Sequence, residues 1–70
     1  MRHAYQKIRV GDRVYWKTGG GPTDVGSGQV LSKEALGRLR VTLNTPTISD
    51  VAALYAEDVI RIERNDEEVL

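Results

Sequence analysis

The segment at residues 18–28, TGGGPTDVGSG, holds five glycines and one proline, and it follows the charged and aromatic run RVYWK at 13–17. β-Branched and aromatic residues are typical of strands. Glycine adopts backbone conformations that other residues avoid, while Pro22 limits the flexibility of the segment. We therefore predict a strand at 13–17, followed by a long loop that turns sharply or lets a ligand backbone approach.

The predicted strand at 13–17 has two different faces. Side chains alternate along a strand, so Val14 and Trp16 share one face. We expect Trp16 to pack in the core with Val14. Arg13, Tyr15 and Lys17 share the opposite face.

Two more strands are predicted at 28–33 and 39–43, joined by a turn at 34–38 in which Gly37 can adopt a positive φ. The sequence LRVTL at 39–43 alternates apolar and polar residues, which is typical of a half-buried strand. Its inward side chains are then Leu39, Val41 and Leu43. The stretch NTPT at 44–47 ends this strand, because proline cannot donate to a neighbouring strand.

The pattern of residues 49–63 is consistent with two structures. Apolar residues recur there at helical spacing, and three alanines favour a helix. Ile60 and Ile62, in contrast, alternate with charged neighbours as they would in a strand.

The order of these segments resembles an SH3-like small β-barrel of the kind found in KOW and Tudor modules. The matching stretches are VGDRVYWK, GSGQVLSK, GRLRVTLN and YAEDVIRIE, in which Glu57-Asp58 precedes the closing strand. The resemblance implies an all-β fold, a five-stranded barrel with strands at 51–55 and 59–63. The alternative fold is a three-stranded antiparallel sheet with a C-terminal helix.

A chain of 70 residues forms one small domain, and such a domain buries only about 60% of the surface of its unfolded chain. We divide it into a loose lead-in at 1–7, the barrel at 8–63 and a frayed acidic tail at 64–70. Cysteine is absent and His3 is the single histidine, so we expect no disulfide, metal or cofactor. An oligomer or a bound partner is then a natural source of buried surface.

No apolar run approaches the roughly 20 residues of a membrane span, and we expect a soluble, cytoplasmic protein without a membrane partner. The formal net charge is zero, but residues 1–40 carry eight Lys or Arg and three Asp or Glu, while residues 41–70 carry two and seven. Three arrangements fit this asymmetry. The two parts contact each other within one fold, the basic part of one subunit contacts the acidic part of another, or the basic part forms a face that binds nucleic acid. We expect the first.

Our functional hypothesis is a non-enzymatic binding or adaptor module whose partner is a protein, another copy of the chain included. Nucleic acid is the alternative partner, because Tyr15 between two cations could stack on a base while the cations contact phosphates. The neutral net charge favours a protein. The candidate contact residues are Arg13, Tyr15, Lys17, Gly19, Gly20, Gly21, Arg40 and Tyr55.

The chain also resembles, more distantly, the type II dihydrofolate reductases, short SH3-like barrels whose homotetramer forms one central active pore. Leu54-Tyr55 fall where that family has an Ile-Tyr pair in the pore wall. Ala53, however, stands where the family has the glutamine that binds both ligands, and Trp16 or Lys17 must replace its pore lysine. Alanine offers no amide hydrogen bonds, so this resemblance implies shared oligomerisation more readily than reductase chemistry.

Overall fold

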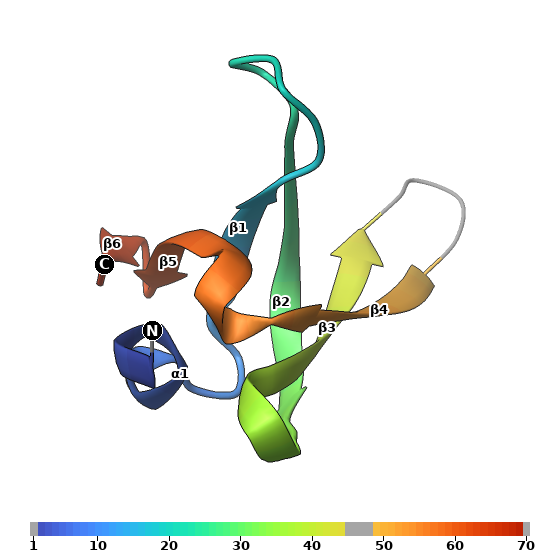
Figure 1. Cartoon of the computed structure of the whole chain (residues 1–70). Helices are drawn as coiled ribbons and strands as arrows, with labels where there is room; N and C mark the ends of the chain where they lie inside the picture. Colours follow the sequence, from blue (N-terminus) through green and yellow to red (C-terminus); the bar gives the residue numbers. More distant parts are fainter. Residues whose placement is uncertain (1, 45–48, 70) are drawn as a thin grey trace.

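The computed structural model describes residues 2–44 and 49–69. Its elements are α1 (Arg2–Lys7), β1 (Arg13–Lys17), β2 (Val25–Lys33), η1 (Ala35–Gly37), β3 (Arg38–Asn44), β4 (Ser49–Tyr55), η2 (Ala56–Asp58), β5 (Val59–Arg64) and β6 (Glu67–Glu68). The six strands form one antiparallel sheet in the order β4-β3-β2-β1-β5-β6 (Figure 1). The structure is therefore mostly β, as predicted. The sheet is open, with β4 and β6 at its ends, so a closed five-stranded barrel stays a prediction.

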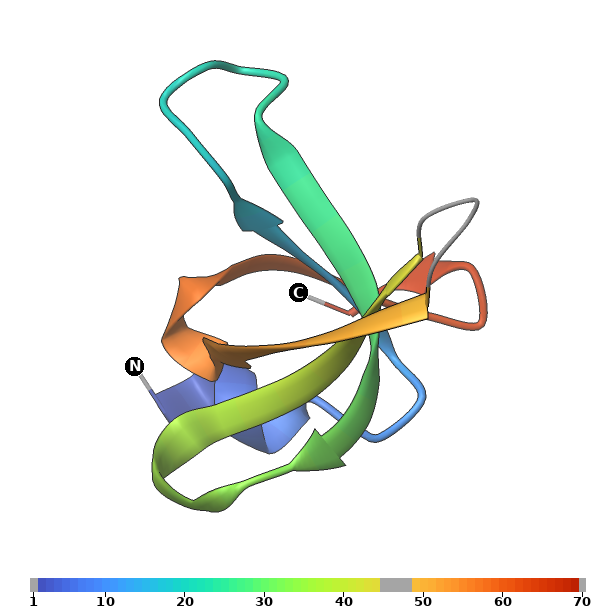
Figure 2. The ribbon, with the colours of Figure 1, turned by 90° about the vertical axis from the view of Figure 1, so that its right-hand side faces the viewer.

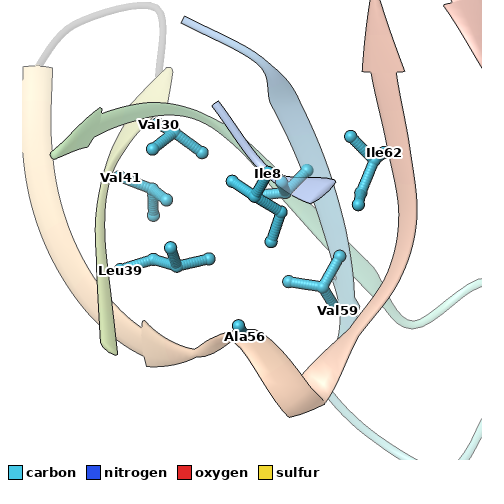
Figure 3. Packing of buried hydrophobic residues seen from close by; sticks show 8 residues of the cluster. Ile8, Val30, Leu39, Val41, Ala56, Val59 and Ile62 are labelled. Carbon is cyan, nitrogen blue, oxygen red and sulfur yellow. The ribbon is translucent and has the colours of Figure 1, made fainter. Parts of the chain in front are cut away.

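The sheet curls around a small apolar core, with β4 and β5 on opposite sides of it and η2 between them (Figure 3). The buried side chains are Ile8, Val14, Val30, Leu39, Val41, Ala56, Val59 and Ile62. Trp16 packs against this cluster from the same face of β1 as Val14, as its spacing in the sequence predicts.

The hairpin of β1 and β2 projects beyond the rest of the sheet (Figures 1 and 2). Its glycines explain why β2 begins at Val25, three residues before the predicted start. Trp16 lies opposite Gly26, and a Cβ at Gly26 would lie 2.8 Å from the indole. A Cβ at Gly28 would overlap the carbonyl oxygen of Thr42 on β3. The two glycines are thus strand residues that make room for an indole and a neighbouring backbone.

The turn between β2 and β3 falls where the sequence predicts it, and Gly37 has a φ of 76°. Leu36 shares this left-handed conformation with a φ of 63°, and the N–H of Arg38 donates to the carbonyl of Ala35. Two consecutive positive φ angles define a type I′ turn, in which Asn-Gly is the preferred pair. Leucine is unfavourable at the first position of this turn, and the sequence pattern does not predict a positive φ at Leu36.

Residues 49–63 form β4, η2 and β5, so the strands at 51–55 and 59–63 are confirmed and the C-terminal helix of the alternative fold is wrong. All seven residues of β4 pair with β3 in an unbroken register. The backbone pairing of β4 with β3 outweighs the preference of the alanines for a helix, because differences in helix propensity amount to only tenths of a kcal/mol per residue. Ile60 departs from the predicted alternation: the β1–β5 register shifts beside it, and its side chain is 48% exposed.

Both ends of the chain correct our expectations. The loose lead-in at 1–7 is wrong, because α1 spans Arg2–Lys7 and Tyr5 packs against the core. The frayed tail at 64–70 is wrong for most of its length, because β6 pairs with β5 and Val69 packs against the core too. The predicted break at 44–47 lies almost entirely outside the described residues. None of the helices in the described ranges is long and apolar enough to cross a membrane.

Candidate protein-interaction surface

Tyr15, predicted as an exposed aromatic between cations, has partners within the chain. Its hydroxyl donates to Glu63 Oε1 over 2.6 Å, and the guanidinium carbon of Arg61 lies 5.6 Å from the ring centre. The hydrogen bond to Glu63 is the main cause that raises the pKa of the Tyr15 hydroxyl above its ordinary value. A base stacking on this face would have to displace Arg61, which weighs against the nucleic-acid hypothesis.

The cations beside Tyr15 differ in their surroundings. Arg13 pairs in register with Glu63 on β5 and is half-buried, while Lys17 is exposed at the end of β1. Arg61 forms ion pairs with Glu63 and Glu68. β1, from the basic part of the sequence, and β5, from the acidic part, are neighbouring strands, so the two parts lie side by side within the fold.

The glycine loop closes around a carboxylate of its own. Asp24 Oδ2 accepts the N–H of Gly21 over 3.0 Å, and the N–H of Thr18 donates to the carbonyl of Asp24 over 2.9 Å. A Cβ at Gly19 would lie 2.7 Å from Asp24 Oδ2, whereas a Cβ at Gly20 would meet nothing within 4 Å. Because a carboxylate fills this side of the loop, an anionic ligand would be repelled there.

Arg40 and Tyr55 lie on β3 and β4, which β2 separates from the β1 residues. Arg40 lies on β3, with its Nη2 3.9 Å from Glu34 Oε1. Tyr55 is the last residue of β4. The guanidinium carbon of Arg38 lies 5.6 Å from the centre of the Tyr55 ring, and Arg38 Nη2 donates a hydrogen bond to the Tyr55 hydroxyl over 3.4 Å. Since β2 separates β1 from β3, the eight candidate residues do not form one site.

The two edges of the sheet have opposite character. One edge is β6, which is two residues long and consists of Glu67 and Glu68. The other is β4, with seven residues that include no Lys, Arg, Pro or Gly, and whose pairing with β3 has no bulge. Shortness, charge, proline and bulges are the features that protect edge strands from pairing with other chains. β6 has two of these features, and β4 has only the charge of Asp50 at its start.

The direction of the β4 backbone groups follows from the sheet. The N–H of Val30 donates to Asp12 and its carbonyl accepts from Gly11, so both face β1. Direction alternates along each strand. Gln29, next to Val30, therefore faces β3, and its partner Thr42 faces β2. Val51, which is opposite Thr42 on β4, then has its backbone N–H and carbonyl directed away from β3, as does every second residue of β4. These residues are Ser49, at the start of the strand, and then Val51, Ala53 and Tyr55.

Val51, Ala53 and Tyr55 have exposed side chains, with Val51 at 53% and Tyr55 at 44%. Ala52 and Leu54, between them, pack against the core. We call the outward backbone and side chains of Val51, Ala53 and Tyr55 the β4 edge, since β4 is the last strand on this side of the sheet order.

A groove of about 530 Å³ lies at the end of β4 and shares Tyr55 with it. Its lining residues are Tyr5, Gln6, Leu36, Gly37, Tyr55, Ala56 and Glu57, and we call it the Tyr5–Tyr55 groove. The Tyr5 hydroxyl donates to the carbonyl of Glu34 over 2.7 Å, and Lys33 Nζ lies 4.3 Å from the ring centre. These contacts fix Tyr5 in place. Leu36, at the rim, is 88% exposed.

Tyr55 is among the eight candidate contact residues predicted from the sequence. Those eight do not include Tyr5, Leu36, Val51 or Ala53, which also belong to this surface. For Tyr5, the spacing of three residues to Ile8 is a helical signal, but one pair is too short a pattern to predict α1. Val51 and Ala53 depend on the strand order, which no local pattern contains.

Comparisons of the chain with protein-family models, curated proteins and solved structures found no match. In residues 2–44 and 49–69, no group of three or more His, Cys, Asp or Glu side chains is arranged to hold a metal ion. Ala53 and Trp16, which bear on the reductase resemblance, lie on different strands, β4 and β1.

Proposed function

We propose that this domain is a non-enzymatic protein-interaction module that binds an extended segment of a partner as an added strand along the β4 edge. The contrast between the two sheet edges carries the proposal. On β4, Ala53 and Tyr55 have outward backbone donors and acceptors, and the outward N–H of Val51 donates to Asp50 Oδ1 over 3.3 Å, a contact that an added strand would replace. The opposite edge is short and doubly acidic. Strand addition obtains its affinity from such main-chain bonds.

The Tyr5–Tyr55 groove supplies a second part of the surface. Because Tyr55 belongs to both features, a strand added along β4 runs towards the groove. In strand addition, pockets for side chains give specificity. Two tyrosines and a leucine suit an apolar or aromatic side chain of the partner.

The experiment is an NMR titration of the labelled protein with a blocked peptide of the β4 sequence, SDVAALY, at the lowest usable protein concentration. We expect saturable shifts confined to β4 and the residues of the groove. Shifts that scatter over the surface, or no shifts at all, would refute strand addition.

Two variants at one position sharpen the test. Ala53→Pro removes an outward N–H, a change that edge strands tolerate, and it should abolish the shifts. Ala53→Ser keeps the N–H and should bind as the wild type does. Equal binding by both variants would show that the peptide does not pair with this edge.

A further inference from the structure

The β4 edge is complementary to itself. Consider two copies placed antiparallel about a twofold axis at Ala53. Val51 of each copy then lies opposite Tyr55 of the other, and the two Ala53 residues face each other. Every residue in these pairs has outward backbone groups, so each pair can exchange both of its hydrogen bonds once the N–H of Val51 leaves Asp50 Oδ1.

The side chains fit this register as well as the backbone does. Val51 and Tyr55 are half-exposed apolar residues on the same outer face of the sheet, and cross-strand pairs of an aromatic and a β-branched residue are favourable. None of the three residues of the β4 edge is charged. Arg40 lies on β3, behind β4, while the Arg38 guanidinium reaches from β3 to the Tyr55 ring and donates to its hydroxyl, so it would lie beside the partner's Val51 in this register.

The size of the domain favours association. Among the residues that the structure describes, eight apolar side chains are buried in the core, of which one is an alanine. The chain has no cysteine to supplement them with a disulfide. Domains of this size gain stability when they oligomerise. Isologous twofold contacts are the commonest form of self-association.

We propose, as a deepening of the proposed function and resting on it, that the partner of the β4 edge is a second copy of this chain. The two β4 strands pair antiparallel about Ala53 and join two six-stranded sheets into one continuous sheet. The partner strand covers Val51 and Tyr55 of each copy.

Charge substitutions at the twofold axis test this register. In the monomer, Ala53 pairs with Arg40, so Ala53→Glu gains an opposite charge across the ladder and should fold. In the dimer, the two glutamates face each other, and like charges directly opposite are destabilising. Light scattering after gel filtration should show a dimer for the wild type and a monomer for Ala53→Glu.

Ala53→Lys should also be monomeric, because it places two lysines at the axis. An equimolar mixture of Ala53→Glu and Ala53→Lys chains should then form a dimer of one copy of each. Ala35→Glu, the same change at an exposed alanine of η1, is the matched control and should stay dimeric.

The possible outcomes separate this inference from the proposed function. A wild type that is monomeric at high concentration but binds the SDVAALY peptide overturns self-pairing and leaves strand addition intact. A wild-type dimer that persists in Ala53→Glu overturns the β4 contact. Monomeric variants that fail to combine overturn the register about Ala53, and a mixed dimer supports it.

Discussion

The carboxylate of Asp12 accepts two hydrogen bonds from the guanidinium of Arg64, from Nε to Oδ1 over 2.9 Å and from Nη2 to Oδ2 over 2.8 Å. Asp12 is 3% exposed and also accepts the N–H of Arg9, while Arg64 donates to the carbonyl of Lys7. The pair therefore joins the end of β5 to the turn before β1 and to the end of α1. The pair thus holds the C-terminal end of β5, from the acidic part of the sequence, against the start of the basic part.

Removal of the Asp12 carboxylate should destabilise the fold strongly. Asp12→Ala leaves the N–H of Arg9 and the guanidinium of Arg64 without their shared acceptor. A broken pair with one buried member costs about 2–3 kcal/mol of unfolding free energy, since Arg64 keeps partial access to water. Urea unfolding measures the loss. Asp58→Ala, at an exposed carboxylate in η2, is the control and should change the midpoint little; equal losses would contradict the role of the pair.

The same pair predicts how stability depends on pH. Burial by itself raises the pKa of the Asp12 carboxyl, but hydrogen bonds from Arg64 and Arg9 and the charges of both arginines outweigh it. The folded-state pKa is therefore below the unfolded value of about 3.9. A lowered pKa contributes stability that is fully present above the unfolded value and lost as the pH falls through the folded value.

We therefore expect the stability difference between the wild type and Asp12→Asn to be constant near neutral pH and to shrink below about pH 4. Urea unfolding of both proteins at several pH values gives this difference. A difference that stays constant down to the lowest accessible pH would show that Asp12 titrates alike in the folded and unfolded states.

Three of the five glycines in the β1–β2 hairpin should respond very differently to alanine. Gly28→Ala would force a methyl group into the Thr42 carbonyl, and overpacking against backbone costs about 3 kcal/mol. Gly26→Ala should cost less, because the indole of Trp16 can shift. Gly20→Ala meets open space at a φ open to alanine and should stabilise the protein by about 0.5 kcal/mol through the unfolded state. Thermal unfolding should give this order, and a neutral Gly28→Ala would contradict the described approach of β2 and β3.

Leu36→Asn should raise stability and lower binding. Asparagine suits the first position of a type I′ turn, and relief of a left-handed leucine is worth about 1 kcal/mol. The same change removes an apolar side chain from the rim of the Tyr5–Tyr55 groove. Thermal unfolding and the SDVAALY titration measure the two effects on one variant. A destabilised Leu36→Asn would show that the leucine packs within its own chain.

The sequence predicts the fold better than the candidate site. Alternation at 13–17 and 39–43 places Val14, Leu39 and Val41 in the core, because burial of one strand face leaves a local period of two. The free edge of β4 is a property of strand order, which arises from pairings between distant residues. The partners of Tyr15 escape prediction for a similar reason, because Arg61 and Glu63 are nearly fifty residues away in sequence.

Amide hydrogen exchange along β4 tests the central claim most directly. Without a partner, the amides of Ala52 and Leu54, which face β3, should exchange slowly, while those of Val51, Ala53 and Tyr55 exchange fast. With saturating SDVAALY peptide, or with a second copy at high protein concentration, all five should become slow. Fast exchange at Val51, Ala53 and Tyr55 in the bound state would contradict strand addition at this edge.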